Sequence, residues 1–218
     1  MNYISYLSPF KHGLSKSFLD KELADKIHAE FPSWDDIIWD KYGKIFKSDY
    51  GYKKELTDRN FFSPSIKLFF SIIETKKFIN TLSASFGLKG LFIDQTLYGG
   101  GLNIYPPGSY LSPHIDYNYD NDLKAYRVIN LIFYVNKDWS KEKGGCLEIC
   151  TKKNGRKKII APELNKCIIF AQNKNTIHGV TTTKDFYRKS ISIWYYSKIV
   201  PPNIQKKPHK TIWIKLDD

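Results

Sequence analysis

The chain has 218 residues, of which 42% are hydrophobic and 16% aromatic, so a disordered protein is excluded and one sizeable core is possible. No run approaches the ~18 consecutive apolar residues of a membrane-spanning helix, and residues 1–14 lack the apolar segment of a signal peptide. The three cysteines form no CxxC pair, which argues against a disulfide framework or a zinc knuckle. We therefore expect a soluble protein, free of membrane, in a reducing, cytoplasmic setting.

The net charge of +12 is concentrated in one part of the chain. Residues 137–218 carry 18 Lys and Arg against 7 Asp and Glu, whereas the preceding residues are nearly balanced. A basic segment of this kind can attract nucleic acid, anionic lipid or an acidic substrate, although a solvated lysine-rich surface is the simpler interpretation. Only four of the 34 basic residues are arginine, the side chain that usually reads bases, which argues against nucleic acid as a partner.

The first part of the chain is predicted to contain two helices. Residues 17–31 place apolar side chains at helical spacing, with Ser17 as a candidate N-cap and Pro32 as the residue that stops the helix. A second helix is predicted to open at Pro64 and to end at Gly87. Between them, residues 33–60 are aromatic, lysine-rich and weakly patterned, which favours one or two short strands within a long loop.

The rest of the chain is predicted to be mainly β-structure. After Gly90, nine short runs rich in β-branched and aromatic residues alternate with turn residues, which is typical of a sandwich or barrel. Two helices ahead of these strands indicate an α+β domain whose helices brace one sheet. We expect one structural domain, with helices and a loop in residues 1–90, the β core in residues 91–200 and a C-terminal extension in residues 201–218.

The first chemical signal is an H-x-D motif, His114 and Asp116, in a predicted strand. Residues i and i+2 of a strand point to the same face, so both side chains can reach one point, and His178 begins a later strand. Two imidazoles and a carboxylate form the facial triad that binds Fe(II) and leaves positions open for a chelating cosubstrate and O₂. An H-x-D pair alone is common, and a lone histidine on a strand is more often a hydrogen-bonded core or surface residue. The remaining histidines lack a spaced companion and are expected at the surface: His12, His28 and His209.

The second signal is an arginine ten residues after His178. Arg188 and Ser190 stand at i and i+2 of one predicted strand, among apolar neighbours. An arginine directed into a core needs an anion, because an unpaired buried guanidinium is very costly, and a carboxylate satisfies this need. The alternative is a surface ion pair with Asp185 or Glu163, which the apolar neighbours of Arg188 make the weaker interpretation.

These motifs, taken in order, resemble the Fe(II)/2-oxoglutarate-dependent oxygenase superfamily. The likeness is greatest to its prolyl 4-hydroxylase-like branch, especially the oxygen-sensing prolyl hydroxylases. The stretch RVINLIFYVNKDWSKEKGGCLEI resembles a strand, a turn and a GG-x-L-x-I strand of that branch, and RKSISIWYYS resembles its closing strand. The similarity covers about residues 98–197. It implies a double-stranded β-helix (jelly-roll or cupin-like) core braced by N-terminal helices.

The resemblance also implies roles for individual residues. Iron would be bound by the triad His114, Asp116 and His178. Arg188 would hold the distal carboxylate of 2-oxoglutarate, Tyr134 would add a hydrogen bond to it, and Tyr105 would contact the cosubstrate near its chelating end. Ser190 matches the Arg-x-Ser pattern of other 2-oxoglutarate enzymes but has no firm counterpart in this branch. Judged without the resemblance, Tyr134 could equally be a core aromatic residue.

On the substrate side, the resemblance implies that Arg127 lies at the pocket rim and that Trp194 lines the pocket, although a tryptophan on a central strand is more often core. The implied reaction is hydroxylation of an unactivated C–H bond with release of succinate and CO₂, using Fe(II), 2-oxoglutarate and O₂, with ascorbate as reductant. Asp116 favours hydroxylation over halogenation. The expected substrate is a prolyl residue of a peptide or protein, hydroxylated at position 4, and residues 39–60 are a candidate lid.

Other functions stay open at this point. The substrate could be a free amino acid or another small metabolite, because the loops expected to select it match the family least. From other classes of protein, a non-catalytic jelly-roll binding module or a basic nucleic-acid-binding domain could carry the same strands. The oligomeric state is not indicated by any motif.

Overall fold

The computed structural model describes residues 3–151, 155, 157–201 and 207–214. Its helices are α1 (Lys21–Glu30), α2 (Ile38–Tyr42), α3 (Pro64–Ile73) and α4 (Lys76–Phe86), with 3₁₀ turns η1 (Arg59–Phe61) and η2 (Lys141–Lys143). Its strands are β1 (Ile4–Tyr6), β2 (His12–Ser15), β3 (Lys44–Ser48), β4 (Gly51–Leu56), β5 (Leu91–Ile93), β6 (Gly101–Tyr105), β7 (Leu111–Ile115), β8 (Tyr119–Asp120), β9 (Ala125–Tyr134), β10 (Leu147–Cys150), β11 (Lys157–Ile160), β12 (Cys167–Ala171), β13 (Ile177–Val180), β14 (Arg188–Ser197) and β15 (Ile212–Trp213).

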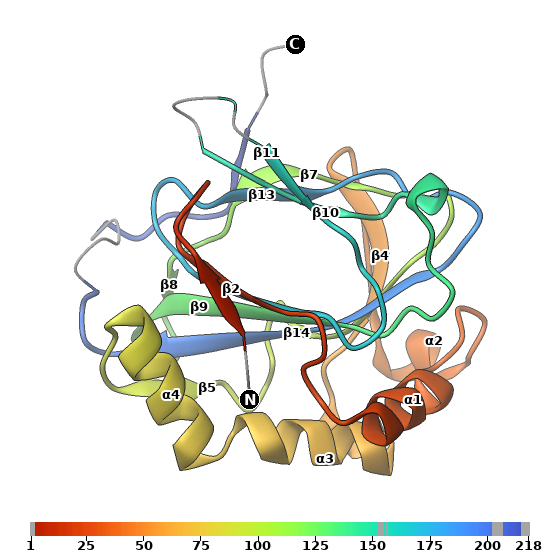
Figure 1. Ribbon diagram of the computed structural model, residues 1–218, viewed down its shortest axis with the longest axis horizontal. Coiled ribbons are helices and arrows are strands. Elements are labelled where there is room, and N and C mark those ends of the chain that lie inside the picture. Colours follow the sequence, from red (N-terminus) through yellow and green to blue (C-terminus); the bar gives the residue numbers. More distant parts are fainter. Residues whose placement is uncertain (1–2, 152–154, 156, 202–206, 215–218) are drawn as a thin grey trace.

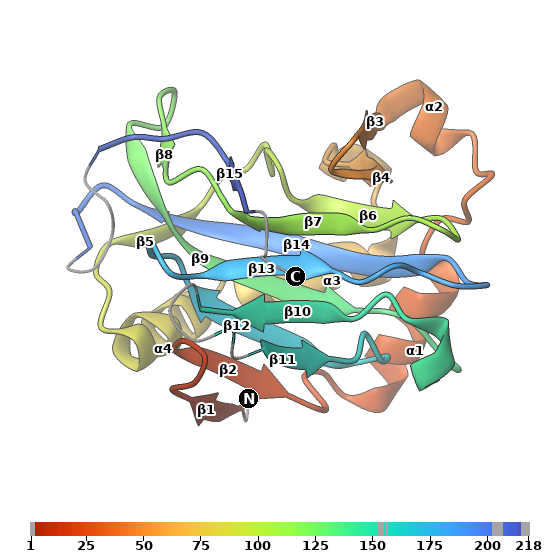
Figure 2. The same ribbon diagram turned by 90° about the horizontal axis from the view of Figure 1, so that it is seen from above.

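The strands form one curled antiparallel sheet, with the order β1-β2-β12-β9-β14-β6-β4-β7-β13-β10-β11. Of the remaining strands, β3 pairs with β4, β5 with β14, β8 with β9 and β15 with β7. In Figure 1 the layer that contains β9 and β14 faces the layer that contains β7, β13 and β10, and β4 lies at the turn between the two. Figure 2 shows β7, β13, β10 and β11 side by side in the second layer. The space between the layers is where inward-facing side chains meet.

Helices α1, α3 and α4 cover the outer face of the β9–β14 layer (Figure 1). Alternation along β14 explains the packing, because Ile191, Ile193 and Tyr195 join the core beneath the helices while the residues between them face inward. On the helix side, the ring of Phe69 lies 5.0 Å from that of Phe133 on β9, measured between ring centroids. The predicted α+β class, with helices bracing the sheet, is confirmed.

The first helix begins later than predicted. Asp20, and not Ser17, is the N-cap of α1, and its carboxylate accepts a hydrogen bond from the Leu23 backbone N–H at 2.8 Å. The backbone N–H groups of Phe18 and Leu19, which precede Asp20, both donate hydrogen bonds to the side-chain oxygen of Asn165. A contact with a residue so distant in sequence leaves no local signal.

The predicted helix after Pro64 is two helices. Its first part, α3, starts at Pro64 as expected, with Ser63 as N-cap. It stops at Ile73, and Thr75 then caps α4 by accepting a hydrogen bond from the Phe78 backbone N–H at 3.2 Å. Gly87 ends α4 in the left-handed conformation, with φ of 68°, as the sequence predicts. The apolar pattern is continuous in the sequence, but Thr75, as the N-cap of α4, divides it into two helices.

The segment from residue 33 to 60 contributes to the core sheet. Strands β3 and β4 form a hairpin, and β4 is inserted between β6 and β7. Residues 39–60, the candidate lid, therefore include a strand of the sheet, which is at odds with a lid that moves as a whole. At the N-terminus, β2 pairs with β12, an element the sequence did not indicate. His12 on β2, predicted at the surface, is fully buried, with Lys158 Nζ 3.0 Å from its Nε2.

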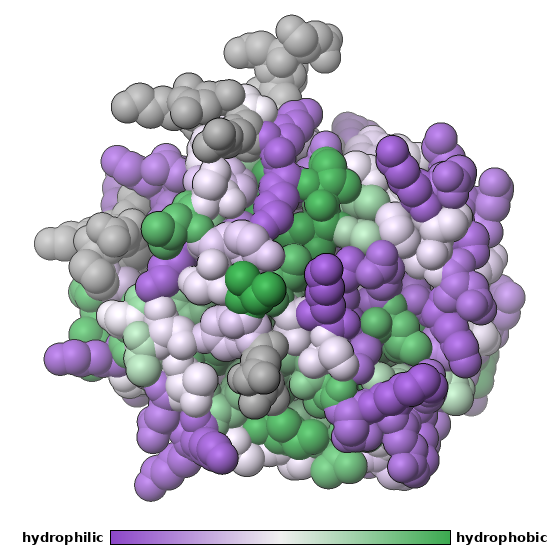
Figure 3. Space-filling view, viewed as in Figure 1, coloured by the Kyte–Doolittle hydropathy of each residue, from purple (hydrophilic) through white to green (hydrophobic). Residues whose placement is uncertain are grey.

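We propose that the three predicted segments form one structural domain. Strands from residues 1–90 pair within the sheet, and β15 of the C-terminal extension pairs with β7. The exposed side of α1 carries the ion pairs Lys21–Asp25 and Lys26–Glu22, and Figure 3 shows hydrophilic residues gathered at that corner of the molecule. No helix within the described ranges is long and apolar enough to span a membrane.

Truncation of Phe69 should destabilise the protein strongly. Phe69 is fully buried between α3 and the sheet, so Phe69→Ala is expected to lower the free energy of unfolding by about 3–5 kcal/mol through lost burial and a residual cavity. Leu68→Ala is the matched control, because Leu68 lies on the same helix but is 50% exposed, and it should change stability by less than about 0.5 kcal/mol. Urea unfolding followed by circular dichroism measures both; similar losses for the two variants would contradict the packing described.

Candidate active site

Two neighbouring strands bring the predicted triad together. His114 on β7 and His178 on β13 are direct partners in the antiparallel pairing, and Asp116 follows β7 immediately. The His114 and His178 rings lie 4.3 Å apart, measured between centroids, and the ligand atoms of all three side chains lie within 4.8 Å of one another. The i, i+2 spacing predicted for His114 and Asp116 thus places both side chains at one point, and the long-range strand pairing supplies the third.

Hydrogen bonds fix the orientation of both imidazole rings. His114 Nδ1 lies 2.8 Å from the Ser112 carbonyl oxygen, and His178 Nδ1 lies 3.1 Å from the Thr176 carbonyl oxygen. Because a carbonyl only accepts, each Nδ1 carries the proton, and each Nε2 directs a lone pair toward Asp116. The distances from Nε2 to the carboxylate oxygens are 3.5 Å for His114 and 3.0 Å for His178.

This convergence of acceptors is the arrangement a metal ion requires. The Nε2 atoms of both histidines and the carboxylate of Asp116, each of which can ligate a metal, therefore face one another in a buried site. The Asp116 backbone carbonyl is held by the Gln172 side-chain N–H at 2.9 Å. Two imidazoles and one carboxylate, on residues that hydrogen bonds orient, suit Fe(II) and leave coordination positions for other ligands.

The electrostatics of the triad keep it ready to bind a cation. Burial opposes the charged form of Asp116, but His178 and His114 hold the pKa of that carboxyl well below its usual value. Burial lowers the pKa of His114, and the neighbouring His178 lowers it further. Burial acts in the same direction on His178, but Asp116 outweighs it and raises the pKa of that imidazole. The site therefore contains an ionised carboxylate and a neutral His114, both in the form that ligates metal.

A buried cation lies in the same cavity as the triad. Arg188 is 2% exposed; its Nε donates to the Gly145 carbonyl oxygen at 2.7 Å and its Nη1 to Ser190 Oγ at 3.3 Å. No carboxylate of the described residues forms an ion pair with it, and the alternative pairing with Asp185 or Glu163 is not formed. A buried guanidinium without an anion is costly, which indicates a site for an anionic ligand.

Two tyrosines lie beside the Arg188 guanidinium, and of these Tyr105 lines the cavity whereas Tyr134 does not. The Arg188 guanidinium lies 4.8 Å from the Tyr105 ring centroid and 5.2 Å from the Tyr134 ring centroid. The Tyr134 hydroxyl is buried and has no hydrogen-bond partner, so it is a second group that lacks a ligand. Desolvation raises the pKa of Tyr134 despite the nearby Arg188. The phenol therefore stays protonated and can donate a hydrogen bond to a carboxylate. Arg188 and Ser190, which line the cavity, and Tyr134 near Arg188 thus provide hydrogen-bond donors that suit a carboxylate ligand.

Trp194 lines the cavity, and Arg127 packs against it outside the cavity lining. The Arg127 guanidinium is stacked between the rings of Tyr117 and Trp194, at 3.9 and 3.7 Å from their centroids. One edge of it lies 3.9 Å from Asp116 Oδ1, and Nη2 donates to the Tyr98 carbonyl oxygen at 2.8 Å. Trp194 lines the cavity beside Arg188, as the sequence suggested, and Arg127 is buried behind it.

The cavity itself has a volume of about 100 Å³. The predicted residues that line it are His114, Asp116, His178, Arg188, Ser190, Tyr105 and Trp194. Sequence reasoning missed Lys53 on β4 and Asn130 on β9, which also line it, as well as Gln172 behind Asp116. Alternation could have found Asn130, because it lies four residues before Tyr134 on the same face of β9. Lys53 had no such signal, since its strand was expected to be part of a loop.

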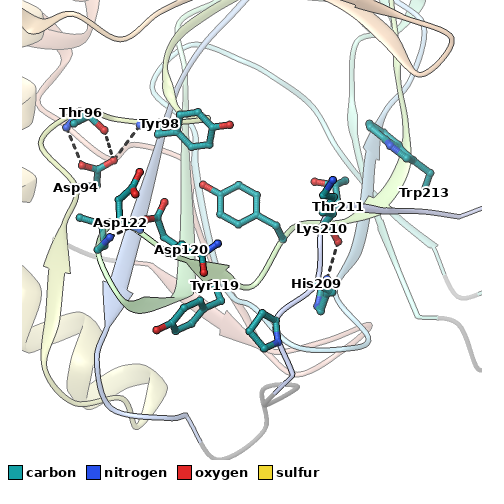
Figure 4. A pocket seen from close by; sticks show the side chains of 14 residues that line it. Asp94, Thr96, Tyr98, Tyr119, Asp120, Asp122, His209, Lys210, Thr211 and Trp213 are labelled. Atoms are coloured by element: carbon teal, nitrogen blue, oxygen red, sulfur yellow. Dashed lines mark hydrogen bonds between the residues drawn. The ribbon is translucent and has the colours of Figure 1, made fainter.

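A larger open groove of about 880 Å³ adjoins the triad (Figure 4). It lies between residues 94–98, residues 117–123 and the segment that leads into β15, and the sticks in Figure 4 show tyrosine and carboxylate side chains along it. Trp213 connects groove and triad, because it lines the groove and its ring lies 4.9 Å from the His114 ring. Tyr98, at the other side, carries the carbonyl that Arg127 binds.

Comparison with known sequences agrees with this geometry. Residues 100–196 match the 2OG-Fe(II) oxygenase superfamily, and this range contains the triad and Arg188. The prolyl 3-hydroxylase sudestada1 of Drosophila melanogaster is 30% identical over 107 residues, a match that covers 43% of this chain and 19% of the fly protein. The matched region is therefore a small part of that longer relative.

Comparison with solved structures shows the same fold. A prolyl-4-hydroxylase of Pseudomonas putida has a TM-score of 0.61 at 16% identity, over 85% of this chain and 92% of its own. A Trichoplax adhaerens prolyl hydroxylase, in complex with a peptide fragment of the hypoxia inducible factor oxygen degradation domain, has a TM-score of 0.62 at 16% identity, over 86% and 84%. The double-stranded β-helix fold is thereby confirmed, as is the resemblance to the 2OG-Fe(II) oxygenase superfamily and its prolyl hydroxylases.

Proposed function

We propose that this protein is an Fe(II)- and 2-oxoglutarate-dependent dioxygenase that hydroxylates a prolyl residue of a peptide or protein. The observation that carries the proposal is a buried Arg188 that has no acidic partner among the described residues, in one cavity with three side chains whose potential metal-ligating atoms lie within 4.8 Å of one another. A metal ion would neutralise and bridge the triad, and a carboxylate ligand would pair with the buried Arg188. The match to the 2OG-Fe(II) oxygenase superfamily supports the choice of cofactor and cosubstrate.

Each side chain has a part in this reaction. When bound, Fe(II) and 2-oxoglutarate supply O₂ activation and C–H hydroxylation, with succinate and CO₂ as products. The triad of His114, Asp116 and His178 would hold the metal. Arg188, with Tyr134 and Ser190, grips the distal carboxylate and so sets the position of the cosubstrate. Tyr105 lines the cavity between the two, and the buried walls exclude water.

The adjoining groove supports a peptide over a free amino acid as substrate. At about 880 Å³ it is much larger than the cavity of about 100 Å³ proposed for the cosubstrate, and tyrosine and carboxylate side chains line it (Figure 4). An extended peptide could lie along Tyr98 and Trp213 with one residue at the metal, and Trp194 with Arg127 would form the wall beside it. The proteins similar to this chain include a prolyl 3-hydroxylase and a prolyl-4-hydroxylase. We propose that this protein hydroxylates the prolyl ring at position 4.

Removing the Tyr98 side chain should weaken peptide binding. Tyr98 lines the groove and is 56% exposed, so Tyr98→Ala leaves its carbonyl bond to Arg127 intact and is expected to raise the KM for peptide about 5- to 30-fold, equivalent to about 1–2 kcal/mol. The KM for 2-oxoglutarate should not change. Tyr42→Ala is the matched control, since Tyr42 is 48% exposed but lies outside the groove. Steady-state kinetics with equal effects of both variants would exclude the groove as the peptide site.

One assay tests the proposed function as a whole. Succinate formation from 2-oxoglutarate should require Fe(II) and be supported by ascorbate, and a screen of peptides and metabolites should identify substrates by the mass gain of one oxygen atom. Amino-acid analysis of the product distinguishes 4-hydroxyproline from 3-hydroxyproline. Absence of metal-dependent 2-oxoglutarate binding would leave the non-catalytic binding module as the function, and hydroxylation of a free amino acid only would exclude the peptide substrate.

A further inference from the structure

A lysine from outside the matched family region reaches the cavity. Lys53 lies on β4, which stands in the sheet between β6, with Tyr105, and β7, with His114. Across these strands Glu55 pairs with Asn103, and Asn103 pairs with Ser190 on β14. Lys53, two residues before Glu55, therefore faces inward from the same side of the sheet, and it lines the cavity that contains the triad.

Two hydrogen bonds orient the Lys53 ammonium and leave its third N–H group available. Its Nζ donates to Glu55 Oε1 and to Asn103 Oδ1, both at 2.7 Å, and its side chain is only 14% exposed. A lysine ammonium has three N–H groups, so these two partners orient it and leave a third N–H available. The neighbouring residue offers the contrast: Lys54 bonds to the Trp34 carbonyl, outside the cavity.

Lys53 and Arg188 both lie close to the ring of Tyr105. Lys53 Nζ is 5.8 Å, and the Arg188 guanidinium carbon 4.8 Å, from the Tyr105 ring centroid. In the order of the strands, Arg188 on β14 is farther from the triad strand β7 than Lys53 is, because β4 is the direct neighbour of β7. The cavity thus contains two cations, Lys53 and Arg188, on two different strands, which suits a ligand with two carboxylates.

The charge on Lys53 is maintained at this position. Burial alone would lower the pKa of Lys53, but Tyr105 and Glu55 counteract burial. Asp116 contributes in the same direction, so the pKa is raised overall.

Building on the proposed function, we propose that Lys53 binds the carboxylate of 2-oxoglutarate that adjoins the keto group, while Arg188 binds the distal one. Its free N–H is the donor to that carboxylate, and Glu55 and Asn103 act as positioning residues that hold the ammonium toward it. A charge-assisted hydrogen bond here supplements the metal in fixing the chelating end of the cosubstrate. Since β4 lies outside the region that matches the family, this contact is a property of this chain's own N-terminal segment.

The test is a panel of three ligands that differ in one carboxylate. Binding to protein loaded with Mn(II), which does not turn over, is measured by calorimetry for 2-oxoglutarate and for 2-oxopentanoate, which lacks the distal carboxylate. Binding of 4-oxopentanoate, which lacks the carboxylate beside the keto group, is measured by competition. Lys53→Met should weaken 2-oxoglutarate and 2-oxopentanoate at least about tenfold and leave 4-oxopentanoate unchanged. Arg188→Met should show the converse pattern.

Two further variants keep the result interpretable. Lys54→Met is the matched control on the adjacent residue and should leave all three ligands unaffected. The double variant Lys53→Met/Glu55→Gln removes the carboxylate that would otherwise lose its partner, and it should show the same ligand pattern if the fold is retained. Unchanged 2-oxoglutarate binding, or equal weakening of 2-oxopentanoate and 4-oxopentanoate, would overturn the role of Lys53. Failure of the unmodified protein to bind 2-oxoglutarate would instead overturn the proposed function, and this role with it.

Discussion

Replacing His178 by alanine should abolish metal binding and, with it, 2-oxoglutarate turnover. The His178 imidazole is one of the three metal ligands of the proposed site, and the Nδ1 bond to Thr176 orients its ring. Loss of an outer partner of a metal ligand typically costs 10- to 100-fold in affinity, so loss of the ligand itself should exceed about 100-fold. Equilibrium dialysis with Mn(II) measures the affinity, and succinate formation measures the turnover.

His28→Ala is the matched control for this experiment. His28 lies on α1, where its Nδ1 is 2.6 Å from the Val135 carbonyl oxygen, so this variant also removes a histidine bound to the backbone. Its metal affinity should equal that of the unmodified protein. Asp116→Asn, which keeps the size of the side chain, should lose metal binding as His178→Ala does. Full turnover by His178→Ala would exclude the triad as the metal site.

Replacing Arg188 by methionine should have opposite effects on ligand binding and on stability. Methionine keeps much of the apolar stem but removes the buried charge, so 2-oxoglutarate should bind about 30- to 5,000-fold more weakly, corresponding to about 2–5 kcal/mol for a lost buried charge contact. Without 2-oxoglutarate, the same variant should be at least as stable as the unmodified protein, because it no longer buries an unpaired guanidinium. Calorimetric titration and thermal unfolding measure the two effects.

Arg59→Met provides the comparison for a structural arginine. Arg59 forms an ion pair with Glu74 at 2.6 Å among the N-terminal helices, away from the cavity. This variant should lose some stability and keep full 2-oxoglutarate affinity. If Arg188→Met instead destabilised the protein as Arg59→Met does and bound 2-oxoglutarate normally, Arg188 would be a structural residue, and the main support of the proposed function would be removed.

Much of the site could be predicted because its signals are local. The i, i+2 spacing of His114 and Asp116 already places both on one strand face, and the same spacing directs Arg188 and Ser190 inward. Along β14 the outward residues are apolar and pack under the helices, so the polar inward residues stand out. A polar residue at an inward position of a central strand is costly to bury, which is why it signals function.

What escaped prediction depends on contacts between distant segments. Asn165 sets the start of α1 by binding backbone groups about 146 residues earlier, and β2 adds to the sheet through β12. Arg127 was expected at a rim, but stacking between two aromatic rings buries it. None of these pairings leaves a pattern in the local sequence, because each partner lies far away along the chain.

Strand periodicity shows which face of a sheet a residue occupies, so the α+β class, the three candidate metal ligands and the arginine proposed for a carboxylate could be predicted from the sequence. The position of β4 between β6 and β7, which brings Lys53 into the cavity, is evident only from the folded structure. The same is true of the groove that residues 94–98, 117–123 and the segment before β15 border near the triad. Strand order and groove walls follow from how distant segments pair and pack, and a residue's own neighbours in sequence carry no record of that choice.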